Sequence, residues 1–495
     1  MSDYLCHIPC GEAVPFQNPH AVSVSLPTLD DVIGYEEGDI AVVGKMKSGY
    51  PRFFRNQQVQ LLMDYVVERF EIAVDTLVLP ITSLKAYEVL SYLINDRLDY
   101  IELEGNIFAL LNQSDSRIQQ IKDYIRNAGL IISSRQAEAT LLKLGLLEAP
   151  FAEDRVGLND GQAAVVSVLS DAYNAKTEHV ILTNSGANAF FAVCEALVCS
   201  GKSNEKNVIV QLGWLYVDTM EVVHKRSRQS YLHLNVHDLQ QLESWLEENH
   251  STVSVVVTEV VSNPKIQCVD IISLYAICEK YRVKLVLDTT LITPFNAPIL
   301  KYCDVAVESL SKFACGKGDV LMGAIVISES SGISPELFRK FVVGPYKGEE
   351  NRLGFEIIDY EKRVLKSSEN TKRLIEVLAQ KKAIKKVWSV LEDTSAGNYN
   401  KLNNSGIIPG LLTIELEDDI ASYYDQLQVA KGPSLGTEFT LVMPYVYLAH
   451  YDLTKSKEGI RILKEKGMSP NILRVSVGIE NSEDIIKVFN SVFDV

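Results

Sequence analysis

Three polar segments of this chain directly follow predicted strands and contain residue types suited to catalysis. These segments are Ser185-Gly186-Ala187 after HVILTN, Asp288 after VKLVL, and Ser309-Leu310-Ser311-Lys312 after DVAVES. A glycine at a helix N-terminus leaves N–H groups free for an anion, although a Ser-Gly pair there is often only a helix cap. A lysine whose pKa is lowered forms Schiff bases with carbonyl groups, and hydroxyls beside it can bind phosphate. Ligands of open α/β sheets bind beyond the carboxyl ends of strands, where all three segments are predicted to lie.

Asp288 narrows the chemistry further. An aspartate that follows an all-apolar strand is costly to bury unless a cation is paired with it. The protonated pyridine nitrogen of pyridoxal 5′-phosphate (PLP) is such a cation, whereas a turn or helix-cap aspartate is the alternative interpretation. A Ser-Gly helix start, then Asp288, then Ser-x-Ser-Lys312 is the order found in PLP sites of the aspartate-aminotransferase-type fold. The sequence therefore predicts PLP, held as a Schiff base on Lys312.

Longer segments resemble the Cys/Met-metabolism family of PLP enzymes. TEVVSNP resembles its Glu-x-Pro-Ser-Asn-Pro segment, LDTTLITPFNAPIL its Asp-Asn-Thr-x-x-Thr-Pro segment, and SLSKFACGKGDVLMGAIV its lysine segment. The resemblance implies that Lys312 is the Schiff-base lysine and Asp288 the partner of the pyridine nitrogen. It also implies phosphate contacts from the residues around the helix start and the lysine, namely Ser185, Gly186, Ala187, Ser309 and Ser311.

Two further segments resemble the family's aromatic contacts with PLP. LYVDTMEV resembles its Tyr-Gly-Gly-Thr turn, which implies that Tyr216 stacks on the cofactor ring and assists proton transfer. SGYPRFF resembles the Tyr-x-Arg segment that reaches a neighbouring subunit's phosphate, and it nominates Tyr50 and Arg52. An arginine fork suits a phosphate group. The resemblance therefore implies a homodimer or homotetramer with a composite active site.

The substrate side of the site is also implied by resemblance. GPSLGTEFTL resembles the family's Ser-Leu-Gly loop and LRVSVGIE its arginine strand, so that Ser434 and Arg474 would hold the substrate α-carboxylate. The N-terminal arm and KGPSLGTEFTLVMPYVYLAHYD resemble the long, fungal-type cystathionine γ-synthase-like members. This chain departs from the family pattern at the phosphate-turn Met, the tyrosine-turn Gly-Gly, the Asn after the aspartate and the His of Gly-His, where it has Ala187, Val217-Asp218, Thr289 and Lys317.

The fungal-type features favour γ-replacement, in which an O-acylhomoserine and cysteine give cystathionine. Lys312 would then act as the general base on the amino-acid substrate. This reaction belongs to transsulfuration in methionine and cysteine metabolism. A C–S lyase or an acylhomoserine sulfhydrylase is the alternative within the class. The departures at Val217-Asp218 and Lys317 motivate a second alternative, a weakly active PLP-binding regulatory homologue.

The elements that must position these residues predict an α/β fold of PLP-dependent transferase type I. Apolar strand-sized runs alternate with amphipathic helices from about residue 155, which indicates a mostly parallel, buried sheet. We expect an N-terminal arm with an extra α/β segment over 1–150, a PLP-binding large domain over 151–345 and an α+β domain over 346–495. QVQLLMDYVVER predicts a helix over Gln57–Arg69, whereas residues 1 to about 45 show little periodicity and predict an extended arm.

Composition excludes several other functions. The net charge of −16 over 495 residues argues against binding to nucleic acid or anionic lipid. No signal peptide and no membrane span are expected. The eight cysteines are scattered, which is typical of reduced thiols in a cytoplasmic protein. Cys6-x3-Cys10 with His7 has no second ligand pair at a usable spacing, so no metal site is predicted.

Overall fold

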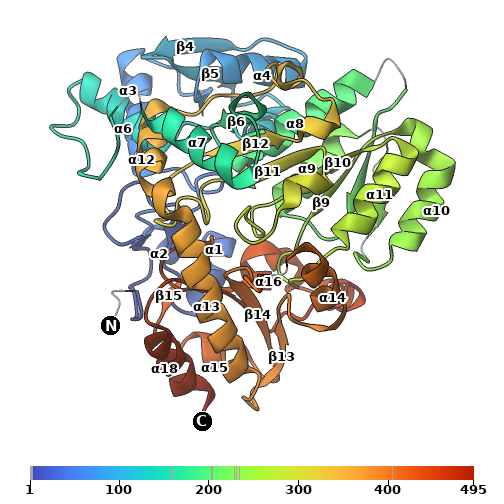
Figure 1. Ribbon diagram of the computed structural model, residues 1–495. Coiled ribbons are helices and arrows are strands. Elements are labelled where there is room, and N and C mark those ends of the chain that lie inside the picture. Colours follow the sequence, from blue (N-terminus) through green and yellow to red (C-terminus); the bar gives the residue numbers. More distant parts are fainter. Residues whose placement is uncertain are drawn as a thin grey trace.

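The computed structural model describes residues 4–157, 160–201, 205–227, 229, 231–233, 235–403 and 405–494. Its three main sheets lie within residues 76–112, 180–327 and 384–476. Figure 1 shows the small sheet at the top, the central sheet in the middle and the C-terminal sheet at the bottom, with both chain ends in the lower half. Domain boundaries at residues 150 and 345 stay a prediction.

The central sheet has seven strands in the order β6-β12-β11-β10-β9-β7-β8. Strand β12 is antiparallel to both of its neighbours, and the other paired strands are parallel. This result confirms the predicted α/β fold with a mostly parallel sheet. The strands are β6 (Val180–Thr183), β7 (Val208–Leu212), β8 (Tyr231–His233), β9 (Val253–Glu259), β10 (Lys284–Asp288), β11 (Val305–Ser309) and β12 (Gly323–Ile327).

Both faces of this sheet are covered, which explains why its strands are apolar on both faces over most of their length. In β10, Leu285 and Leu287 belong to one core cluster, whereas Val286 faces the other. The helices of this layer are α7 (Gly161–Tyr173), α8 (Gly186–Gly201), α9 (Val217–Arg226), α10 (Leu239–Asn249), α11 (Ile271–Tyr281) and α12 (Lys347–Glu356).

The extra N-terminal segment is an α/β layer packed on the α8 side of the central sheet. Its antiparallel sheet has the order β3-β5-β4. The β4–β5 hairpin, which the sequence analysis did not predict, turns at Glu104 and Gly105 with φ of 51° and 81°, as a two-residue turn requires. Helix α3 has the predicted bounds. The elements are α3 (Gln57–Arg69), β3 (Thr76–Ile81), α4 (Leu84–Ile94), β4 (Asp99–Leu103), β5 (Asn106–Asn112), α5 (Ile118–Asn127) and α6 (Ser134–Lys143).

The arm is not simply extended, and that prediction was wrong. It forms two short strands, β1 (Ala13–Val14) and β2 (Ser23–Val24), and two helices, α1 (Leu29–Glu37) and α2 (Ile40–Val43). Thr28 and Asp31 form a capping box that starts α1, because each side chain accepts a bond from the other residue's backbone N–H. Leu29 and Val32 pack into the core of the C-terminal domain.

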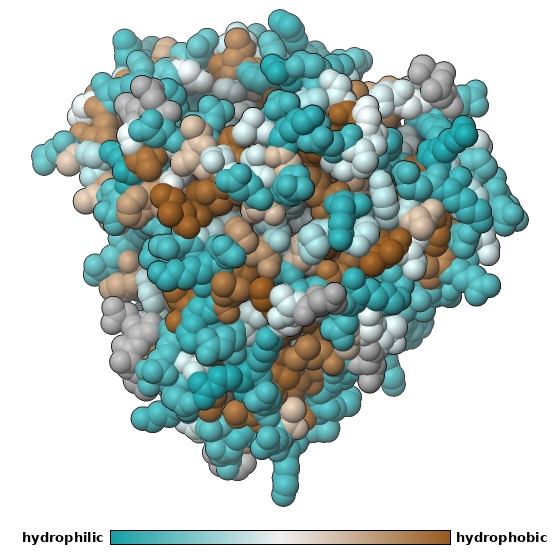
Figure 2. Space-filling model, viewed as in Figure 1, coloured by the Kyte–Doolittle hydropathy of each residue, from teal (hydrophilic) through white to brown (hydrophobic). Residues whose placement is uncertain are grey.

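The C-terminal domain has a five-stranded sheet in the order β13-β14-β17-β16-β15. On the surface of the whole molecule, Figure 2 shows a largely hydrophilic face with hydrophobic patches in the middle of the view. No helix in the described ranges is long and apolar enough to cross a membrane. The elements are α13 (Tyr360–Leu378), β13 (Ile384–Trp388), α14 (Asp393–Leu402), β14 (Leu411–Leu416), α15 (Ala421–Tyr424), β15 (Ala430–Lys431), β16 (Leu441–Pro444), α16 (Tyr445–Ala449), α17 (Lys457–Glu465), β17 (Ile472–Ser476) and α18 (Ser482–Phe493).

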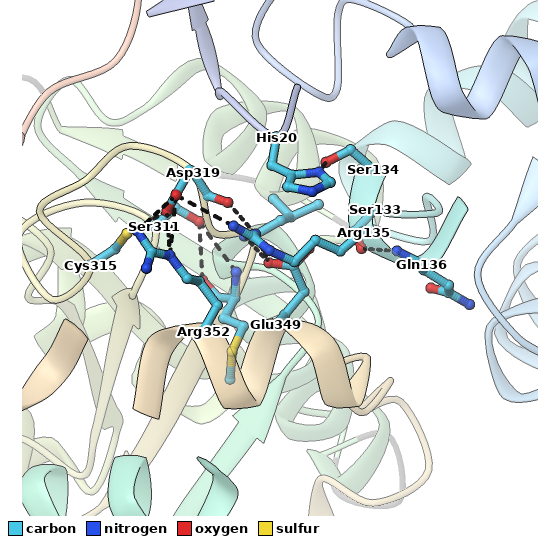
Figure 3. Close-up of polar contacts among 12 residues, drawn as sticks. His20, Ser133, Ser134, Arg135, Gln136, Ser311, Cys315, Asp319, Glu349 and Arg352 are labelled. Carbon is cyan, nitrogen blue, oxygen red and sulfur yellow. Dashed lines mark hydrogen bonds and ion pairs between the residues drawn. The ribbon is translucent and has the colours of Figure 1, made fainter. Parts of the chain in front are cut away.

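A buried polar cluster around Asp319 joins the arm, the extra segment and the large domain. Asp319 lies in the loop that follows Lys312, and Figure 3 shows Arg135 of α6 and Arg352 of α12 converging on it. The Asp319 carboxylate lies 3.1 Å from Arg352 Nη2 and 3.4 Å from Arg135 Nη2. It also accepts a 3.0 Å hydrogen bond from Asn18 of the arm. The loop carrying Lys312 is therefore fastened to three separate segments of the chain.

Candidate active site

A cavity of about 540 Å³ lies where β9, β10 and β11 end. This is the edge at which an open α/β sheet binds its ligands. The arm, α8, α9 and the C-terminal domain complete its walls. Ten of the twelve residues predicted from the sequence line it together, namely Tyr50, Arg52, Gly186, Ala187, Tyr216, Asp288, Ser309, Lys312, Ser434 and Arg474.

Lys312 is a buried amine that faces polar partners. Its Nζ donates a 2.8 Å hydrogen bond to Ser434 Oγ and lies 4.5 Å from the ring centroid of Tyr50. Burial lowers the pKa of Lys312, which favours the neutral, nucleophilic amine. Burial opposes ionisation of Tyr50, but the charges of Lys312 and Arg52 outweigh it and lower the pKa of Tyr50 to about 7.

Two acidic residues stand side by side at the strand ends. Asp288 and Glu259 are register partners in β10 and β9, and both line the cavity. Burial raises the pKa of Asp288, and burial together with Asp288 raises that of Glu259 well above its usual range. Asp288 Oδ1 accepts a 2.9 Å bond from Thr290 N, and the Thr290 side chain also bonds to this carboxyl group, but no described Lys or Arg forms an ion pair with it. A cationic ligand group would satisfy this carboxylate.

The start of α8 and the end of β11 approach closely. A Cβ on Gly186 would lie 2.7 Å from Ser309 Cβ, so that only glycine permits this approach. Ser185 and Ser311 are not among the lining residues. Ser185 Oγ accepts from Asn188 N at 3.2 Å as a helix cap, and Ser311 Oγ bonds to the backbone of Met322. Phosphate contact by these two hydroxyls stays a prediction that their present bonds do not favour.

Arg52 and Tyr216 contact each other in the wall of the cavity. Arg52 Nη2 donates a 2.6 Å hydrogen bond to Tyr216 Oη, and its guanidinium lies 5.1 Å from the Tyr216 ring centroid. Asp218, the second residue of α9, forms a 2.5 Å ion pair with Arg52 Nη1. Tyr50 and Arg52 belong to the same chain as the cavity they line, because the arm docks on its own C-terminal domain. Whether a second subunit also contributes to this site stays a prediction.

Arg474 lies on β17 and lines the cavity from the C-terminal domain. Its Nη2 donates a 2.5 Å bond to the carbonyl oxygen of Ser434, and its guanidinium lies 5.6 Å from the Tyr445 ring centroid. Burial lowers its pKa to about 10, which leaves it charged at neutral pH. No described carboxylate forms an ion pair with Arg474, so that its charge is available to an acidic ligand group.

The family described as Cys/Met metabolism PLP-dependent enzyme matches residues 163–494. The chain belongs to this family. Among curated relatives, an L-2-amino-4-chloropent-4-enoate dechlorinase/desaturase of Streptantibioticus cattleyicolor is 34% identical over 483 residues, covering 96% of both chains. The cystathionine γ-synthase of Neurospora crassa is 26% identical and covers 97% of both. The structure of cystathionine γ-synthase from Xanthomonas oryzae pv. oryzae with aminoacrylate and cysteine has a TM-score of 0.57 at 18% identity, covering 70% of this chain and 91% of that one.

This Cys/Met-metabolism enzyme uses PLP, and its cavity fits that cofactor. Lys312 supplies a buried amine with a lowered pKa, and Asp288 is a carboxylate without a cation. Gly186 opens α8 toward the cavity, where free N–H groups suit a phosphate. When bound, PLP supplies an electron sink that stabilises carbanions of amino acids.

Among the cavity residues that the sequence analysis did not assign, Glu259, Asp218 and Asn127 bear on the site. Glu259 accepts hydrogen bonds from Tyr216 N at 2.7 Å and Asn263 N at 3.2 Å, and so fixes the start of α9. Its position within TEVVSNP was the available signal. Asp218 was noticed only as a departure from Gly-Gly, and Asn127 of the extra segment gave no sequence signal.

Proposed function

We propose that this enzyme eliminates a leaving group from the γ-carbon of a single amino acid. The proposal rests on the small number of basic side chains that line the cavity. The cations among its described lining residues are Arg52, Lys312 and Arg474. Arg52 suits the cofactor phosphate, Lys312 is the reactive amine, and Arg474 can hold one α-carboxylate. Cysteine as a second substrate would bring a second carboxylate for which no cation is left.

The outer wall supports the same proposal. It is built by the arm and α16, and Glu36 is its acidic group. Burial raises the pKa of Glu36 to about 7, and its ionised fraction repels an incoming amino-acid carboxylate. The wall suits an apolar side chain with a small leaving group, as in a chlorinated alkene. Its apolar residues are Val43, Phe53, Phe54, Leu448 and Ala449.

The side chains divide the work as follows. Arg474 holds the substrate carboxylate and thereby fixes the orientation of the α-hydrogen. The Lys312 amine takes the α-proton and then moves protons at the β-carbon, while Ser434 holds its Nζ. Tyr216 stays in place because Glu259 holds its backbone N–H and Arg52 its hydroxyl. The leaving group departs from the γ-carbon as an anion and is released to solvent.

A second candidate is the γ-replacement that joins an O-acylhomoserine to cysteine. It is supported by relatives named cystathionine γ-synthase, such as those of Neurospora crassa and Saccharomyces cerevisiae, at 26% and 24% identity. A C–S lyase, a sulfhydrylase and a weakly active regulatory homologue remain the further alternatives. We also propose a cytoplasmic homo-oligomer, which the absence of disulfide bonds among the described cysteines and the exposed Ile40 in the arm support.

One experiment separates these functions. The purified protein with PLP is incubated with L-2-amino-4-chloropent-4-enoate and with O-acetyl-, O-succinyl- and O-phosphohomoserine, each with and without cysteine. Products are identified by mass spectrometry, and chloride is measured. Chloride release that does not need cysteine supports elimination. Cystathionine formation would replace this proposal with γ-replacement, and bound PLP without any product would favour the regulatory homologue.

A further inference from the structure

The turn that ends α5 in the extra segment lies directly against the start of α8. Asn184 Nδ2 donates to Gly129 O at 2.6 Å, and Asn188 Nδ2 donates to Ala128 O at 3.0 Å. Gly129 has a φ of 64°, and a Cβ there would collide with Ser185 Oγ. These contacts fix the preceding residue, Asn127, beside the helix start that faces the cavity.

Asn127 carries a buried donor without a partner in the part of the chain that the structure describes. The residue is 3% exposed and lines the cavity. Arg126 Nε donates to Asn127 Oδ1 at 3.2 Å. Because a guanidinium can only donate, the amide oxygen must face Arg126 and the amide nitrogen must point away from it. Asn127 Nδ2 has no hydrogen-bond partner among the described residues, and leaving such a group unsatisfied is costly.

The surroundings of this nitrogen suit an anion. Gly186 and Ala187 begin α8, where free N–H groups and the helix dipole favour negative charge. Ala187 is small, and it stands where the resembling family segment has methionine. The nearby carboxylate, Asp218, is already paired with Arg52 at 2.5 Å and with Arg126 at 3.6 Å.

We propose that Asn127 donates an N–H to the phosphate group of PLP. The extra segment then takes part in holding the cofactor, in addition to covering one face of the sheet. This assignment does not depend on which reaction the enzyme catalyses, since it concerns cofactor binding alone.

The test compares PLP with pyridoxal, which lacks the phosphate. Dissociation constants for both are measured by absorbance titration of the full-length apoprotein, for the wild type, Asn127→Ala and Asn127→Asp. Loss of a charge-assisted hydrogen bond should weaken PLP binding about tenfold in Asn127→Ala. Asn127→Asp should weaken it further, because its carboxylate repels the phosphate. Pyridoxal binding should stay unchanged in both variants.

The control is Gln120→Ala, an exposed position on the same helix that should leave both constants unchanged. Equal weakening of PLP and pyridoxal would overturn the proposal, because it indicates a general disturbance of the site. Unchanged PLP binding in both Asn127 variants would overturn it as well. Inorganic phosphate, titrated as a competitor of PLP, should also bind more weakly to Asn127→Ala than to the wild type.

Discussion

Asp218 Oδ2 lies 2.5 Å from Arg52 Nη1, and both side chains are almost fully buried, at 4% and 5% exposed. Asp218 also lies 3.6 Å from Arg126 of the extra segment. One carboxylate therefore joins the arm, the extra segment and helix α9 at the edge of the cofactor cavity. Its neighbours are two arginines, so that its removal leaves positive charge uncompensated.

We expect Asp218→Asn to destabilise the apoprotein and to increase its response to PLP. Removing one partner of a buried ion pair costs about 3 kcal/mol or more. The cofactor phosphate would compensate part of this loss. Thermal unfolding with and without PLP measures both effects. Asp123→Asn is the matched control, because Asp123 also pairs with Arg126 but is less buried. Equal PLP-induced shifts in the wild type and Asp218→Asn would contradict the expectation.

Lys312→Ala should lower kcat by about a hundredfold or more, since general-base catalysis contributes on that scale. PLP should also be lost on dialysis. Steady-state kinetics and the absorbance of the dialysed protein provide the measurements. Lys317→Ala removes a half-exposed lysine that pairs with Glu438, and it should retain activity. Full activity of Lys312→Ala would refute the assignment of the reactive amine.

Arg474→Lys should raise KM for the amino acid about tenfold, because an ammonium cannot replace a two-pronged guanidinium on a carboxylate. The dissociation constant for PLP should not change, since Arg474 is assigned to the substrate. Arg461→Lys on the exposed side of α17 serves as the control. A change in PLP binding without a change in KM would place Arg474 on the cofactor instead.

Glu308 should make stability depend on pH. Its carboxylate accepts bonds from Tyr173 at 2.7 Å and Tyr360 at 2.6 Å. Burial raises its pKa from 4.5 to about 7. The folded chain thus binds this proton more tightly than the unfolded chain, and stability falls as pH rises across that interval, by up to about 3 kcal/mol.

Glu308→Gln should remove the contribution of this carboxyl group to the pH dependence of stability. The thermal midpoint should then change less between pH 5 and pH 8. The control is Glu361→Gln, at an exposed position on α13. An identical pH profile for the wild type and Glu308→Gln would show that Glu308 does not titrate in this interval.

Local patterns in the sequence predicted the elements that depend on periodicity. The bounds of α3 and the mostly apolar strands followed from local patterns alone, and the chain order of Gly186, Asp288 and Lys312 placed the cavity. Helix α1 was missed because it is short and its few apolar residues, Leu29 and Val32, are buried only by contact with the C-terminal domain. Asp218 and Asn127 could not be assigned, because their surroundings are created by segments distant in the sequence. The same limit applies to Tyr50 and Arg52, whose order along the chain does not say which subunit they serve.

The Asp319 cluster has a consequence for how the chain unfolds. Its contacts come from the arm, from α6, from α12 and from the loop that follows Lys312. Any one of these segments can leave only by exposing a buried charge on the others. The extra segment and the large domain should consequently melt in a single cooperative transition, and limited proteolysis should not release either as a folded fragment. The extra segment would in this way be a part of the folding unit rather than a separable appendage.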